Sequence, residues 1–264
     1  MKCRVCDSEN LKLFYTQGNE DQFRLYRFGV CGLVNLDMEG LNLLEHQEKY
    51  AGEEEVPGDY ESETKVRQSY RFIKKYVPMP VSAPGRYMDI GCGGGGMLYF
   101  AQKDGWRVKG LELSPVLAKL VSEKLGVDVE VANFLEYTGD EGVYDLVSLR
   151  HVLEHLTDSF AAMNNISRLL KPEGYAHLEF PNINGISFRL RRFLARTGLY
   201  KKKYDPDWRP GHCNEFSRKP FEYLLGRTGF TLIRWETYSH KPIADFFFNR
   251  IHTGTKARVI IRKI

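Results

Sequence analysis

The sequence predicts an α/β fold with a doubly wound, mostly parallel sheet, and three observations support this prediction. A short apolar segment at residues 87–90 runs directly into five glycines within six residues. An apolar run from residue 97 then begins a helix. Strand-like and helix-like segments alternate along most of the remaining chain. A strand, a glycine turn and a helix start together form a nucleotide-binding corner, because glycine lets a ligand approach the backbone and the helix start offers unpaired N–H groups.

Hydrophobic periodicity places the individual elements. Residues 62–77 carry apolar side chains on one helical face, and the prolines that follow end this helix. Ser114 and Pro115 are typical of a helix start, since serine caps the first N–H groups and proline suits the first helical position. The expected strands cover residues 87–90, 107–112, 127–131, 144–149, 174–180, 229–238 and 255–264, and the expected helices cover residues 62–77, 97 onward, 115–125 and 159–170.

The glycine pattern alone leaves the ligand open. Gly91, Gly93 and Gly96 fit G-x-G-x-x-G, the pattern of dinucleotide sites. From Asp89 onward the residues also fit D-x-G-x-G, which resembles the first motif of class I S-adenosylmethionine-dependent methyltransferases. A carboxylate at position 89 would repel a dinucleotide pyrophosphate, whereas S-adenosylmethionine carries an amino group, a sulfonium and no phosphate. Asp89 therefore favours S-adenosylmethionine over a nicotinamide cofactor.

Glu112 is the candidate ribose ligand. It ends the strand at residues 107–112 and lies 21 residues after Gly91. An acid at this place accepts hydrogen bonds from both ribose hydroxyls. Nicotinamide enzymes share the feature, so Glu112 predicts a nucleoside site without identifying the nucleoside.

Three further segments resemble a large bacterial branch of the same family. Residues 145–156 resemble its fourth-strand motif, and residues 171–182 resemble its turn and fifth strand, usually L-K-P-G-G and then P-N. Residues 211–217 resemble its later H-x-x-x-F-S element. Four motifs thus stand in the correct order across roughly residues 60–238. The resemblance implies a seven-stranded Rossmann-like sheet with an antiparallel last strand, in a cofactor-binding domain over residues 62–264.

The resemblance also implies where the cofactor lies. Arg150 and His151, after the fourth strand, are expected beside the methionine part of S-adenosylmethionine. Asn133 and Phe134 are expected at the adenine, where the amide can pair with the base edge and the ring can stack. Many relatives have Asp at position 133, so the role of Asn133 is less well supported. The expected cofactor residues are Asp89, Gly91, Cys92, Gly93, Gly95, Glu112, Leu113, Asn133, Phe134, Arg150 and His151.

Residues 1–45 are expected to form a separate, zinc-ribbon-like unit. Cys3 and Cys6 have the spacing of a zinc knuckle, and Cys31 lies where a second knuckle would end. The segment resembles the zinc ribbons that precede some bacterial methyltransferases, but Phe28 replaces the fourth cysteine. Two hypotheses follow. Either the three thiolates bind zinc with a fourth ligand such as His46, or the ribbon has lost its metal and Phe28 fills the space.

Two charged segments flank the expected cofactor site. Residues 46–61 are acidic and form either a solvated linker or a lid, in which Tyr50 or Tyr60 would close over the cofactor. Residues 186–204 contain seven basic residues and no acid, above an apolar helical stripe. We predict a basic cap insertion at about residues 183–212. It would bind an anionic acceptor or contact an anionic membrane surface, or it is an ordinary surface helix.

Histidines are the candidate catalytic residues, because a hydroxyl acceptor benefits from a base with a near-neutral pKa. His212 is the first candidate, since it follows Gly211 in a loop expected at the carboxyl edge of the sheet. His151 is the second. For His155, which is expected on a helix, a structural role is favoured.

The composition narrows the function without naming an acceptor. The chain has 264 residues, 42% of them hydrophobic, and a net charge of +4, which does not by itself indicate nucleic acid. No apolar run has the roughly 18–20 residues that a membrane span needs. The five cysteines and the polar N-terminus suggest a reduced, cytoplasmic protein. We predict an S-adenosylmethionine-dependent methyltransferase for a small molecule or glycan precursor, with oxygen favoured as the methylated atom. The alternatives are an RNA methyltransferase and a non-catalytic assembly protein.

Overall fold

A seven-stranded sheet forms the centre of the protein in a computed structural model, which describes residues 1–3, 5–41, 56–79, 84–200, 202–206, 208–239 and 249–264. The strand order is β10-β11-β8-β7-β4-β5-β6. The five strands from β8 to β6 are parallel to one another, and β11 is antiparallel to both β8 and β10. The predicted doubly wound sheet with an antiparallel last strand is confirmed. The bounds are β4 (Arg86–Ile90), β5 (Arg107–Glu112), β6 (Asp128–Val131), β7 (Tyr144–Arg150), β8 (Leu170–Pro181), β10 (Phe230–Tyr238) and β11 (Lys256–Lys263).

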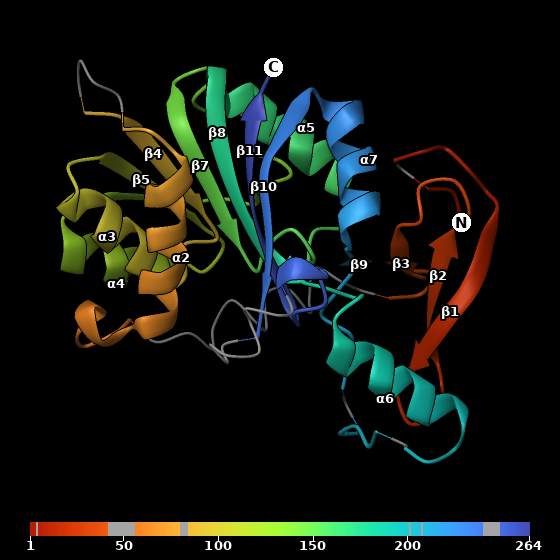
Figure 1. Ribbon diagram of the computed structural model, residues 1–264. Coiled ribbons are helices and arrows are strands. Elements are labelled where there is room, and N and C mark those ends of the chain that lie inside the picture. The colour runs from red at the N-terminus through yellow and green to blue at the C-terminus, as the bar shows by residue number, and fades with distance from the viewer. Residues whose placement is uncertain (4, 42–55, 80–83, 201, 207, 240–248) are drawn as a thin grey trace.

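Helices cover both faces of this sheet (Figure 1). One side carries α2 (Thr64–Tyr76), α3 (Gly96–Lys103) and α4 (Pro115–Leu125), and the other carries α5 (Ser159–Leu169) and α7 (Arg218–Thr228). Each set buries its own apolar cluster against the sheet, with Ile73 and Leu98 on one side and Ile166 and Leu224 on the other. The predicted start of α4 is confirmed, because the Ser114 hydroxyl accepts a hydrogen bond from the N–H of Leu117 at 3.3 Å.

A second, four-stranded sheet contains most of the N-terminal segment. Its order is β1-β2-β3-β9, with β1 (Leu11–Gln17), β2 (Phe23–Phe28), β3 (Val34–Leu36) and β9 (Asn214–Glu215). The fourth strand comes from a part of the chain almost 180 residues later, within the H-x-x-x-F-S element. The strands β1 to β3 are therefore joined by hydrogen bonds to the rest of the molecule through β9. The domain boundary at residue 45 falls outside the described residues and remains a prediction.

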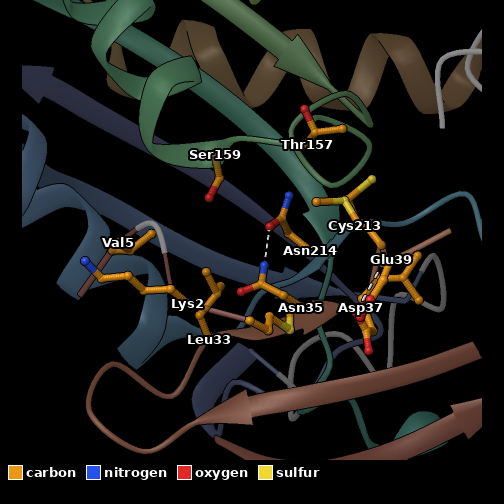
Figure 2. Close-up of a pocket in the computed structure, with 13 residues that line it drawn as sticks. Lys2, Val5, Leu33, Asn35, Asp37, Glu39, Thr157, Ser159, Cys213 and Asn214 are labelled. Carbon is orange, nitrogen blue, oxygen red and sulfur yellow. Dashed lines mark hydrogen bonds between the residues drawn. The ribbon is translucent and has the colours of Figure 1, made fainter. Parts of the chain in front are cut away.

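A cavity of about 300 Å³ lies at the junction of β3 and β9 (Figure 2). The side chains of Asn35 and Asn214 face each other there, and the Asn35 amide donates to the Asn214 carbonyl oxygen. Thr157 and Ser159 line the opposite wall, at the start of α5. The junction between the N-terminal sheet and the main sheet is thus partly polar.

The predicted basic cap contains α6 (Ile186–Arg196), which lies beside β1 at one end of the molecule (Figure 1). The Phe188 and Tyr15 rings meet edge to face, 5.2 Å between centroids. Within the described ranges, none of the helices combines the length and apolar character that crossing a membrane requires. His46, Tyr50 and most of the acidic linker lie outside the described residues.

Candidate active site

The turn after β4 is shaped by glycines that no other residue could replace without strain. Gly91 has φ +64°, and a Cβ placed there would lie 2.4 Å from a methyl carbon of Val152. Gly95 has φ +81°, and its Cβ would lie 2.6 Å from Val121. Positive φ and lack of space both exclude larger residues at these positions. The turn therefore leads into α3 with its backbone held close to neighbouring side chains.

The Glu112 carboxylate lies against this turn, at the end of β5. One oxygen accepts from the N–H of Gly93 at 2.9 Å, and the other accepts from the N–H groups of Leu113 and Ser114 at 2.8 and 3.0 Å. Its residue is only 6% exposed. These bonds fix the carboxylate in the position predicted for a ribose ligand, next to the glycines.

Asp89 lies beneath the turn, inside the sheet. Its carboxylate accepts a hydrogen bond from the Ser148 hydroxyl, and the residue is 3% exposed. Burial raises the pKa of Asp89 to about 7, although the hydrogen bond from Ser148 and the positive charge of Arg150 act in the opposite direction. Asp89 thus lies just before the turn, close enough to Arg150 for their charges to interact. Direct contact of Asp89 with a cofactor remains a prediction.

Arg150 is held by a buried acid. Its Nε donates to Oε2 of Glu179 at 3.1 Å, and Glu179 is fully buried. Burial acts to raise the pKa of Glu179, but its partner His177 and the charge of Arg150 outweigh burial and hold the pKa below the usual value. The pair fixes Arg150 at the carboxyl end of β7, where the resemblance places the methionine part of the cofactor.

The two predicted adenine residues lie in different environments. Asn133 is half-buried, and its side-chain oxygen accepts from the N–H of Leu135 at 3.1 Å. Phe134 is 5% exposed and belongs to the core cluster that includes Met163 and Ile166. Most of the Phe134 ring therefore packs inside the protein, and adenine stacking on it remains a prediction.

Tyr60 adds a group that the sequence suggested only as a lid. It lies in a single 3-10 turn, Tyr60–Ser62, and its ring stacks on Tyr99 at 4.9 Å. Its hydroxyl is buried and has no hydrogen-bond partner in the described part of the chain. Burial, with contributions from Glu63 and Cys92, raises the pKa of Tyr60 to about 12. A buried, unpaired hydroxyl near Cys92 is a candidate ligand group that spacing alone could not identify.

His151 is held in a strained conformation with both ring nitrogens engaged. Its φ is +57°, which is uncommon for a residue with a side chain and concentrates at functional sites. Nδ1 lies 3.2 Å from Oε1 of Glu154, and Nε2 lies 3.1 Å from Nζ of Lys256. A carboxylate accepts and an ammonium donates, so these two contacts engage both ring nitrogens of His151.

His212 is arranged differently. Its Nδ1 lies 3.2 Å from Oε1 of Glu215, which also accepts a hydrogen bond from the Tyr15 hydroxyl at 3.3 Å. Burial lowers the pKa of His212, but the hydrogen bond and charge of Glu215, with Glu154, outweigh burial and raise the pKa above the usual value. Among the described residues Nε2 has no hydrogen-bond partner. The lone pair of a neutral His212 is therefore available.

Tyr15, Glu154 and Glu215 are site residues that the sequence analysis did not single out. Glu215 stands three residues after His212, a spacing that could have indicated the pair. Glu154 is 1% exposed, and one of its oxygens is buried without a partner among the described residues. Tyr15 gave no such indication, because it comes near His212 only when β1, β2, β3 and β9 assemble into one sheet.

Two clusters of described residues have side chains that can hold a metal ion. The ligand atoms of Glu154, His155 and His212 all lie within 4.8 Å of one another, and two histidines with a carboxylate suit several divalent metals. The thiol sulfurs of Cys3, Cys6 and Cys31 likewise all lie within 4.8 Å of one another. The folding of the chain thus brings the three predicted cysteines together.

The thiol cluster fits zinc only in part. Sγ of Cys3 and Cys31 lie 3.7 Å apart, and this contact lowers the pKa of Cys3 to about 6. Phe28, at the position of the fourth ligand, is 1% exposed and packs in the same core cluster as Cys3 and Cys31. Structural zinc sites use four ligands, and the described residues supply three.

Comparison with known proteins now identifies the family. A family described as "Methyltransferase domain" matches residues 63–234, about two thirds of the chain. The chain belongs to this methyltransferase family. Membership agrees with the methyltransferase motifs that the glycine turn and the three later segments resemble, and the strand order confirms the predicted Rossmann-like fold.

Curated relatives of this methyltransferase include ubiquinone biosynthesis O-methyltransferases. The protein of Xanthomonas campestris is 31% identical over 122 residues, which are 44% of this chain and 51% of that protein. The protein of Alkalilimnicola ehrlichii is 32% identical over 159 residues, 55% of this chain and 64% of that protein. The matched region thus spans about half to two thirds of the length of these relatives.

Solved structures support the fold. The PH0226 protein from Pyrococcus horikoshii superimposes with a TM-score of 0.59 at 16% identity, covering 83% of this chain and 99% of that one. Geranyl diphosphate C-methyltransferase from Streptomyces coelicolor superimposes with a TM-score of 0.57 at 16% identity, covering 85% and 100%. At this identity the similarity establishes the architecture alone.

Proposed function

We propose that the protein transfers the methyl group of S-adenosylmethionine to a hydroxyl of a small molecule. One observation carries this proposal. Glu112 lies against the glycine turn after β4, and Arg150 and His151 lie at the end of β7, the strand that pairs with β4. In open α/β sheets ligands bind at the carboxyl ends of the strands. The names of the O-methyltransferase relatives support the choice of an oxygen acceptor.

The chain's own residues would hold the cofactor at this edge. Glu112 would accept hydrogen bonds from the ribose hydroxyls, and Arg150 and Tyr60 would lie beside the methionine part. Gly91, Cys92, Gly93, Gly95 and Leu113 would form the backbone wall, with Asn133 near the adenine. When bound, S-adenosylmethionine supplies an electrophilic methyl group. Positioning of the acceptor accounts for much of the rate in such a transfer.

His212 is the general base in this proposal. With the Nδ1 proton directed to Glu215, the lone pair on Nε2 can take the proton of an acceptor hydroxyl. Glu215 orients the ring and stabilises the imidazolium that forms. His151 would instead orient Glu154 and the end of β7, because both its nitrogens are already engaged.

Membrane contact through α6 is a second, separate candidate. Ile186, Leu190 and Phe193 are 47%, 56% and 61% exposed on one face of this helix. Exposed apolar side chains beside basic residues are typical of helices that lie on anionic membranes. Sedimentation with anionic vesicles tests it, and loss of binding in Phe193→Ser is expected.

A glycan precursor as acceptor and zinc in the thiol cluster also remain proposals.

Ligand binding and methyl transfer test the main proposal separately. Calorimetry should show tighter binding of S-adenosylhomocysteine than of NAD, and Glu112→Ala should weaken that binding by about 2–4 kcal/mol, since charged hydrogen bonds are lost. Glu112→Gln is the control for volume. An isotope-labelled methyl-transfer screen against sugars, lipids, quinones and RNA then assigns the acceptor. Tighter binding of NAD would overturn the cofactor assignment. Binding of S-adenosylhomocysteine without methyl transfer to any acceptor would favour the assembly-protein alternative.

A further inference from the structure

A pocket of about 670 Å³ lies between β1, α6 and the loop that carries His212. Tyr15 and Phe188 contribute aromatic rings to its lining, and Asn182 and Ile183, which follow β8, also line it. His212 and Glu215 line it as well. The volume falls within the range of about 300–1,000 Å³ that small-molecule sites occupy. The proposed base therefore opens on a space large enough for an acceptor.

The charges lining this pocket are predominantly positive. Arg191, Arg192, Arg196 and Lys202 line it, against the carboxylates of Asp21 and Glu215. Glu215 already accepts hydrogen bonds from His212 and Tyr15. In the described ranges, none of the three arginines forms a salt bridge. Arg192 is half-buried, whereas Arg191 and Arg196 are exposed, so the mutual repulsion of these cations falls mainly on Arg192 and a bound anion would reduce it.

Two arginine side chains lie over the same aromatic ring. The guanidinium carbon of Arg27 lies 3.8 Å from the centroid of Phe14, and that of Arg192 lies 4.0 Å from it. Nε of Arg27 is buried and has no hydrogen-bond partner among the described residues. Burial and the charge of Arg192 lower the pKa of Arg27, and burial with Arg196 and Arg189 lowers that of Arg192. An anion in the pocket would relieve this repulsion.

α6 separates its two faces clearly. Phe188, Arg191, Arg192 and Ala195 face the pocket, whereas Ile186, Leu190 and Phe193 are exposed elsewhere on the helix. Arg189 is exposed, lies on the same helix and does not line this pocket. The arginines at the pocket therefore have a role distinct from that of the exposed apolar face.

We propose that this pocket binds the methyl acceptor and that the acceptor is a small molecule with a phosphate or diphosphate group, an inference that rests on the proposed function. Arginine suits phosphate because its planar guanidinium donates two parallel hydrogen bonds. The anionic group lies at Arg191, Arg192 and Arg196, the body of the acceptor packs on Tyr15 and Phe188, and a hydroxyl reaches His212. The N-terminal sheet thereby forms one wall of the acceptor site.

Calorimetry with inorganic pyrophosphate tests this proposal on the full chain. The parent protein should bind pyrophosphate, and Arg192→Gln should weaken binding by about 10- to 100-fold, as expected for a lost charged hydrogen bond. Arg189→Gln removes the same charge from the same helix, and we expect a change of about twofold or less, because Arg189 does not line the pocket and its exposed charge is screened. Equal weakening by both variants, or no binding by the parent at millimolar pyrophosphate, would overturn the proposal.

Two further measurements in the same preparations separate the possible failures. S-adenosylhomocysteine should bind Arg192→Gln and the parent equally, which shows that the variant is folded. If the parent binds S-adenosylhomocysteine but not pyrophosphate, the phosphate inference fails and the proposed function stands. If the parent does not bind S-adenosylhomocysteine, the proposed function itself fails. Binding to phosphatidylglycerol vesicles that Arg192→Gln abolishes, without pyrophosphate binding, would assign these arginines to lipid headgroups and overturn the pocket.

Discussion

The turn after β4 is built from the backbone of one short segment, whereas the pocket beside α6 is built from side chains of distant segments. Gly91 and Gly95 shape the first by their conformation, and Glu112 joins it through backbone N–H groups. The second combines Tyr15, Arg192 and His212, which come from three separate parts of the chain. The proposed cofactor side therefore tolerates few changes of backbone, and the proposed acceptor side can change by side-chain substitution alone.

The largest expected effect is at the turn. In Gly91→Ala the new Cβ would meet Val152, and the left-handed conformation alone costs about 1–2 kcal/mol. We expect S-adenosylhomocysteine affinity to fall at least ~100-fold by calorimetry, because even small displacements of the turn misplace the ligand. Gly226→Ala is the control, since it lies in α7 with open space around its Cβ. Unchanged affinity in Gly91→Ala would show that this turn does not bind the cofactor.

The next effect concerns the other side of the site. His212→Ala should lower methyl-transfer turnover by about 10²–10⁴-fold while leaving S-adenosylhomocysteine affinity nearly unchanged. His252→Ala is the matched control, because His252 lies away from this pocket's lining. Loss of cofactor affinity in His212→Ala would instead place His212 in the cofactor wall and remove the functional division between the two sides.

The same division explains what the sequence could predict. Asp89, the glycines and Glu112 lie within 24 residues, so motif spacing located them, and strand–helix alternation located the main sheet. Glu215 and Tyr15 lie about 200 residues apart and meet only through the pairing of β3 with β9. No local pattern contains such a contact. Phe134 shows the limit of motif spacing. The resemblance placed this residue at the adenine, but its ring packs mainly in the core.

A smaller effect is expected in the pH dependence. The pKa of His212 lies above its usual value because Glu215 favours the charged ring, so the rate should rise with pH as His212 loses its proton. Glu215→Gln removes that charge, and the rising limb should move to lower pH. Tyr15→Phe leaves the charge in place and should hardly move it. A limb that stays in place in Glu215→Gln would mean that another group limits the rate.

The smallest effect is expected from removing metal from the thiol cluster of the N-terminal sheet. Small zinc ribbons generally unfold without metal. Here Phe28 is buried in the core cluster, and burying such a side chain stabilises the fold by about 1.5–3 kcal/mol. The pairing of β3 with β9 also holds this sheet without a metal. Dialysis against a chelator should therefore lower the melting temperature by no more than about 4 °C, which corresponds to about 1 kcal/mol. Elemental analysis before and after dialysis measures the zinc removed, and Cys6→Ser is the control for the thiol cluster. Unfolding of the N-terminal sheet on dialysis, with release of one zinc per chain, would show that a fourth ligand completes the site and that metal rather than apolar packing holds this wall of the pocket.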